Sequence, residues 1–166
     1  MVTLPPLDPM LVQRVWQSVG YALWQIQELE TTLAMYLVMV HKLEPGVARE
    51  EAESVFEKTR KKTLGQLLHD LRTQQAAPAN LVARLDQFVD ERNWLAHRSR
   101  AESRRQLYNP AHTHLLLERL NRIGEDALSL MKDLQAGTEA YLATQGISRD
   151  RIDDQMAAVI QEWTGL

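Results

Sequence analysis

Apolar residues recur every three or four positions along most of this chain, which is the period of one buried helix face. The longest run begins at Asp8-Pro9, where Asp suits an N-cap and Pro suits the first helical turn. It ends near residues 43–46, where Pro45 and Gly46 stop a helix. Its apolar positions are Val12, Val15, Trp16, Val19, Leu23, Ile26, Leu33, Leu37 and Val40. A first helix of this length is typical of a helical bundle.

The same period predicts further helices over 47–58, 63–71, 80–100 and 109–144, and a short final helix over about 148–164 that begins at Ser148. Residues 76–80 read as a connector, and residues 102–108 as a loop or a frayed helix end. No segment alternates with the two-residue period of a half-buried strand. We therefore expect an all-α fold, an antiparallel bundle of roughly five to six helices.

Some apolar and small residues carry expectations about packing. Trp16, Trp24 and Tyr36 lie at helical spacing from core residues, so we expect them to pack in the core. Gly65 lies inside a predicted helix, where a glycine permits a close approach of a second helix.

Size and composition match one globular domain, expected over residues 1–166, because the chain has 45% hydrophobic and 25% charged residues. The absence of cysteine excludes a disulfide framework and a thiol nucleophile. The N-terminus lacks a basic region followed by an apolar run, and no run reaches the roughly 18 apolar residues of a membrane span. A cytoplasmic protein that does not enter the membrane is the expectation.

The net charge of −3 gives no global argument for nucleic acid, but the basic residues are clustered. One cluster lies at 58–62, and the other contains Arg98, Arg100, Arg104 and Arg105. Such a cluster is either a solvated helix face or a local anion-binding surface.

One charged residue falls where the helical pattern predicts core. On a wheel of about 100° per residue, Arg92 lies near the centre of the apolar arc of the 80–100 helix, while Asn93 and His97 share its edge and Trp94 lies on the opposite flank. The members of that arc are Leu81, Leu85, Phe88, Val89, Leu95 and Ala96. In the first helix, Glu30 similarly falls in the apolar stripe. Because buried charges need partners, we expect an ion pair between Glu30 and Arg92, with charged ends within about 6 Å.

The segment from Arg92 to His97 resembles the R-x4-H motif of HEPN domains (higher eukaryotes and prokaryotes nucleotide-binding), in which a polar residue such as Asn93 often follows the arginine. The preceding Phe88-Val89 and the upstream sequence Lys-Thr-Leu-Gly-Gln-Leu-Leu at 62–68 extend the similarity. The resemblance covers about residues 8–144 and leaves the final helix outside.

This resemblance implies a metal-independent endoribonuclease of toxin or anti-phage effector type, which needs no cofactor. Two protomers would form a composite site in a homodimer. His97 would act as general acid and base, Arg92 would stabilise the charge of the phosphorane, and Asn93 would orient His97 or the phosphate. A protein antitoxin or regulator is an implied partner. In one HEPN subfamily a tyrosine two residues after the histidine is modified by adenylylation, but this position is Ser99 here, so that mode of neutralisation is not expected.

The chemistry of these side chains agrees with such a role, because histidine titrates near neutrality and a guanidinium matches phosphate oxygens. The basic cluster formed by Arg98, Arg100, Arg104 and Arg105 could then follow an RNA backbone. Two other functions stay open: a non-catalytic helical interaction or immunity module, in which Arg92 is structural, and a regulator that binds a small nucleotide in the composite cleft. His112 and His114 are interpreted as surface residues and not as metal ligands, since no third ligand accompanies them.

Overall fold

The computed structural model describes residues 6–43 and 46–147, together with the isolated positions 150, 153, 154, 157, 161 and 165. The predicted final helix from Ser148 lies outside the two continuous ranges. Within the described part of the chain there is no β-strand, so the all-α fold is confirmed. No helix in this part has the length and apolar character required to span a membrane.

The helices follow the predicted order. They are α1 (Pro9–Leu37), α2 (Arg49–Thr59), α3 (Leu64–Thr73), α4 (Ala79–Asn93), α5 (Ser99–Ser103) and α6 (Pro110–Thr144). A π-helical turn over Val38–Lys42 extends α1, a second one over Trp94–Arg98 joins α4 to α5, and a 3-10 turn over Gln106–Tyr108 precedes α6. The predicted helix over 80–100 is therefore interrupted at Trp94, and helical structure continues to Ser103, into the segment predicted as a loop or a frayed helix end.

The start signals read from the sequence act as caps in the structure. The Asp8 side chain accepts a hydrogen bond from the backbone N–H of Met10 at 2.9 Å, and Asn109 accepts one from Ala111 at 3.0 Å. Thr63 forms a capping box with Gln66 at the start of α3. These caps fix where the three helices begin.

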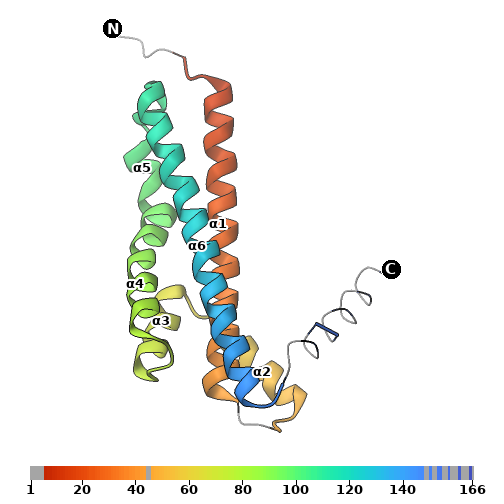
Figure 1. The fold of residues 1–166 in the computed structure, drawn as a ribbon. Helices are drawn as coiled ribbons and strands as arrows, with labels where there is room; N and C mark the ends of the chain where they lie inside the picture. The colour runs from red at the N-terminus through yellow and green to blue at the C-terminus, as the bar shows by residue number, and fades with distance from the viewer. Residues whose placement is uncertain are drawn as a thin grey trace.

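The most extensive helix–helix interface is between α1 and α6, which lie side by side and run in the same direction (Figure 1). The register shows this, because Tyr21 of α1 lies against Gly124 of α6 and Tyr36 lies against Gly137 further along both helices. The arm formed by α4 and α5 runs the opposite way, while α2 and α3 pack at the far end. The α4–α5 arm is thus antiparallel to the two long helices, while the central pair is parallel.

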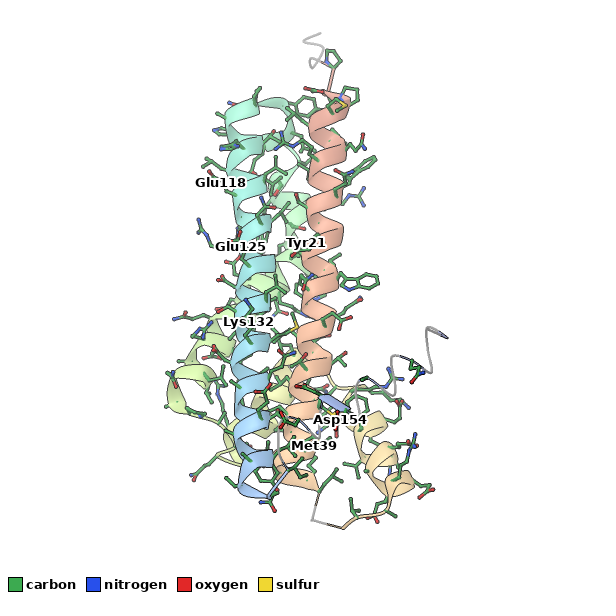
Figure 2. The ribbon with its side chains drawn as sticks, turned by 45° about the vertical axis from the view of Figure 1, so that its right-hand side comes forward. Tyr21, Met39, Glu118, Glu125, Lys132 and Asp154 are labelled. Carbon is green, nitrogen blue, oxygen red and sulfur yellow. The ribbon has the colours of Figure 1, made fainter. Side chains whose placement is uncertain are left out.

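The core is aliphatic. Its fully buried large side chains are Leu29, Leu33, Leu37, Val38, Leu64, Leu67, Leu71, Leu85, Leu120, Ile123, Leu130 and Leu134. They come from α1, the first π turn, α3, α4 and α6, and Phe56 of α2 packs against the same core, so one core joins all the longer elements. Glu118, Glu125 and Lys132 lie on the outer side of α6, away from α1 (Figure 2).

Polar contacts of two residues, Tyr36 and Asp70, stabilise the end of the bundle that contains α3. The hydroxyl of Tyr36 donates to the carbonyl oxygen of Ala76 at 2.6 Å, and burial raises the pKa of this phenol. Asp70 of α3 lies 2.7 Å from Lys62 and 3.4 Å from Lys42. Burial alone would raise the pKa of Asp70, but the hydrogen bonds and charges of the two lysines outweigh it and hold the pKa below its ordinary value.

Two glycines of α6 allow the close approach of α1. A Cβ atom at Gly124 would lie 2.7 Å from the ring of Tyr21, and one at Gly137 would lie 2.9 Å from the ring of Tyr36. Figure 2 shows Tyr21 between the two helices. The prediction that Gly65 serves this purpose was wrong, since a Cβ there would meet nothing within 4 Å.

These glycines predict a graded response to alanine. Gly137→Ala should lower the free energy of unfolding by about 1–3 kcal/mol, because Tyr36 is buried, hydrogen-bonded and unable to move aside. Gly124→Ala should cost less, because Tyr21 is half exposed. Gly65→Ala is the matched control and should stabilise by up to about 1 kcal/mol through helix propensity. Urea denaturation of the three variants measures this order, and equal stabilities for Gly137→Ala and Gly65→Ala would contradict it.

Candidate functional site

The predicted ion pair between α1 and α4 is present. Arg92 Nη2 lies 3.4 Å from Glu30 Oε1, within the expected 6 Å, and both side chains are largely buried. The same Glu30 oxygen also accepts a hydrogen bond from the backbone N–H of Leu64 at 3.2 Å. Because this N–H lies at the start of α3, the carboxylate also meets the positive end of that helix.

Asn93 completes a small cluster with this pair. Arg92 Nη1 donates to Asn93 Oδ1 at 3.4 Å, and the Asn93 side chain is exposed. A guanidinium carries five N–H donors, so these two contacts leave donors of Arg92 unused. The two contacts hold the arginine in place.

His97 lies on the second π turn and is exposed. Across this turn the backbone N–H of Ser99 donates to the carbonyl of Trp94, five residues earlier. In a regular α-helix, residues five apart diverge by about 140°. The wider turn reduces this divergence for the residues that follow Trp94, and such turns are frequent at functional sites. No hydrogen bond joins His97 to Arg92 or Asn93 in the described ranges.

Ala96 departs from the helical wheel, because it was expected in the core arc and is exposed. Trp94, on the flank opposite His97 where a second packing surface or the dimer contact could use it, is only 3% exposed. Arg119 of α6 covers Trp94, with its guanidinium carbon 3.5 Å from the ring centroid. A helical wheel of one helix cannot show that a side chain from another helix, here Arg119, covers Trp94. The π turn changes the direction in which the Ala96 side chain points around the helix axis.

A second cluster forms around Trp94, and nothing in the sequence indicated the residues that hold it together. Arg119 makes two hydrogen bonds to Glu91 of α4, at 2.9 and 3.0 Å. Trp94 Nε1 donates to Glu102 Oε2 at 2.7 Å. Trp94 and Glu102 are eight residues apart, whereas side chains that contact each other on a regular helix are three or four residues apart, so their contact could not be predicted from the sequence. The cluster fixes the arm on both sides of the π turn that carries His97.

The basic cluster after His97 has two parts. Arg98 lies 4.0 Å from Glu102 and forms a weak exposed pair with it. Arg100, Arg104 and Arg105 are exposed and form no ion pair with any residue of the described ranges. Arg100 and Arg104 line a cavity beside Trp16, and Arg105 does not. Three cations are thus available to an anion beside the motif.

An uncharged face of α1 is exposed. No residue from 15 to 27 carries a charge, and Trp16 and Trp24 are 71% and 65% exposed. The expectation that these two tryptophans pack in the core was wrong, while Tyr36 is buried as expected. Gly20 lies four residues from each tryptophan, and a Cβ atom there would meet nothing within 4 Å. We call residues Trp16, Gly20, Leu23 and Trp24 the uncharged α1 face.

The histidines on α6 behave as surface residues. His112 and His114 are exposed, and His114 Nε2 lies 3.2 Å from Glu118 one turn away. In the part of the chain that the structure describes, no three His, Asp or Glu side chains are placed to hold a metal ion.

Comparisons with protein-family models, with characterised proteins and with solved structures found no match for this chain. The HEPN assignment is therefore a proposal that rests on the motif and its surroundings.

The contacts of Glu30 predict its importance for stability. Glu30→Ala should lower the free energy of unfolding by about 2 kcal/mol, because it leaves Arg92 and the Leu64 N–H without this acceptor. Glu30→Gln should cost about half as much, since its amide oxygen can still accept a hydrogen bond. Glu28→Ala, on the exposed face of the same helix, is the control and should stay within about 0.5 kcal/mol of the wild type. Equal urea midpoints for the variants at 28 and 30 would show that the pair is not structural.

Proposed function

We propose that the protein is a HEPN-like endoribonuclease that cleaves RNA without a metal ion and acts as a homodimer. The observation that carries this proposal is an exposed His97 on a π turn, a few residues after an arginine that Glu30 and Asn93 hold in place. An exposed histidine suits proton transfer, and a fixed guanidinium suits the stabilisation of phosphate charge.

The reaction proposed is attack of a ribose 2′-oxygen on the adjacent phosphorus. His97 of one protomer takes the proton of the 2′-hydroxyl, and the partner's His97 donates a proton to the leaving 5′-oxygen as its bond to phosphorus breaks. Arg92 stabilises the negative charge on the phosphorane, and Asn93 orients the phosphate or His97. The products are a 2′,3′-cyclic phosphate and a 5′-hydroxyl.

The neighbouring cations support an RNA substrate. Arg98, Arg100, Arg104 and Arg105 follow His97 directly, and the last three have no ion-pair partner in the described ranges. Unpaired arginines can contact phosphates and release counterions, which makes binding salt-dependent. A toxin or anti-phage effector, restrained by a partner protein, is the cellular role that fits the proposed activity.

The proposed homodimer would form along the uncharged α1 face. Its exposed tryptophans are apolar and aromatic, as in the centre of many interfaces, and Gly20 leaves room for a second helix. A two-fold axis would double every catalytic group, so one histidine per chain could supply both an acid and a base.

A second candidate function is a non-catalytic interaction module with the same fold. The contacts of Arg92 favour it, because an arginine bound to Glu30 has a structural role whether or not catalysis occurs. The uncharged α1 face would then bind a different protein.

Cleavage of RNA distinguishes these functions. Purified wild type should cleave labelled single-stranded RNA or tRNA in EDTA and leave 2′,3′-cyclic phosphate ends. His97→Ala should lower the rate by at least about 100-fold, the usual contribution of a general acid or base, with helicity unchanged. His69 is also exposed but lies on α3, so His69→Ala is the control and should cleave RNA like the wild type. Absence of cleavage by folded, dimeric wild type would favour the interaction module.

The oligomeric state tests the uncharged α1 face. Wild type should sediment at twice the chain mass, and Gly20→Glu should sediment as a folded monomer, because it places a charge at the centre of an apolar interface. The monomer should fold, since a Cβ at this position meets no neighbouring atom within 4 Å. Leu115→Glu, at an exposed apolar position of α6, is the control and should remain dimeric. A wild-type monomer, or a dimer with glutamate at position 20, would contradict the proposed interface.

A further inference from the structure

A cavity of about 490 Å³ lies where the first half of α1, the α5 segment and the first turns of α6 meet. Its walls are mainly aliphatic, with Trp16 exposed at the edge. The aliphatic lining residues are Val15, Val19, Leu107, Leu116 and Leu120. The size is within the range of sites for small organic ligands, which is about 300–1,000 Å³.

The charged residues that line the cavity are two arginines. Arg100 and Arg104 are four residues apart, both line the cavity, and neither has an ion-pair partner in the described ranges. Among the residues that the structure describes, no acidic side chain lines the cavity. Its charge therefore favours an anion, and its aliphatic walls favour an apolar group attached to that anion.

Ser103 gives a second, independent indication of a ligand. It lines the cavity, is 6% exposed, and its buried Oγ has no hydrogen-bond partner in the described ranges. Ser99, one turn earlier, instead donates its hydroxyl to the carbonyl of Leu95 at 2.7 Å. An unpartnered buried hydroxyl is costly and uncommon in a folded protein. Because the Ser103 Oγ is itself buried, a bound head group would reach it only after rotation about χ1 to another staggered position.

We propose that this cavity binds a small amphipathic carboxylate, with an unbranched hydrocarbon tail against the aliphatic walls and a carboxylate between Arg100, Arg104 and Ser103. A nucleobase fits less well, because its edge carries several donors and acceptors, whereas most of the lining residues other than the arginines are aliphatic. Arg92 and His97 do not line the cavity, but it shares Arg100 and Arg104 with the proposed RNA-binding cluster and Trp16 with the uncharged α1 face.

Calorimetric titration with dodecanoate, below its micelle-forming concentration, tests the proposal on the full chain. The wild type should bind one molecule per chain. Dodecyltrimethylammonium, which has the same tail and the opposite charge, should bind at least about tenfold more weakly, since the arginines repel it. Acetate, which has the head group alone, should show no measurable binding.

Two variants separate the cavity from the rest of the surface. Ser103→Ala should weaken dodecanoate binding about tenfold by removing a donor to a charged group. The same change should leave the thermal unfolding midpoint of the free protein unchanged or raised, because the hydroxyl it removes has no partner. The double variant Arg100→Gln with Arg104→Gln should weaken binding by more than tenfold. Arg122→Gln, at an exposed arginine of α6 outside the cavity, is the control and should bind like the wild type, while Trp24→Ala tests whether the amphiphile binds the uncharged α1 face instead.

Several results would overturn the proposal. They are no binding of dodecanoate, equal binding of the cationic analogue, or unchanged binding by both cavity variants. Loss of binding in Trp24→Ala would place the amphiphile on the uncharged α1 face. Tighter binding of uridine or adenosine monophosphate than of dodecanoate, lost in Ser103→Ala, would make the cavity a nucleotide site.

Discussion

The carboxylate of Glu30 joins three helices. It belongs to α1, lies 3.4 Å from Arg92 of α4 and accepts a hydrogen bond from Leu64 at the start of α3. A largely buried charge is costly unless it is paired and hydrogen-bonded, and here an opposite charge and a helix N-terminus both compensate it. The same contacts fix the arginine that the proposed chemistry requires. Stability and the geometry of the candidate site therefore depend on one side chain.

The direction of the chain decides which groups come together. Because α1 and α6 run in parallel, the arm of α4 and α5 must return along them, and it is the arm that carries the motif. Gly124 and Gly137 let the rings of Tyr21 and Tyr36 fit between the long helices. In addition to the ion pair of Arg92 with Glu30, the arm contacts α6 through Arg119, which covers Trp94. The π turn between α4 and α5 is thus supported on both flanks while His97 stays exposed.

The proposed RNA-binding arginines and the proposed carboxylate site share two residues. Arg100 and Arg104 follow the motif in sequence and also line the cavity beside Trp16. An anion in the cavity would reduce the positive charge that is available to an RNA backbone.

The sequence by itself predicted most helices of the described ranges, the caps of α1 and α6 and most leucines of the core, because local propensity, start signals and apolar spacing act along one chain. It also determined the pairing of Glu30 with Arg92, since charges placed in apolar stripes need each other. The rotation of Ala96, the burial of Trp94 and the exposure of Trp16 and Trp24 were decided only by the tertiary structure. A π turn changes the helical phase without a clear sequence signal, and burial depends on which neighbouring helix covers a given face. The parallel direction of α1 and α6 is likewise a property of the path of the whole chain, which no single helix encodes.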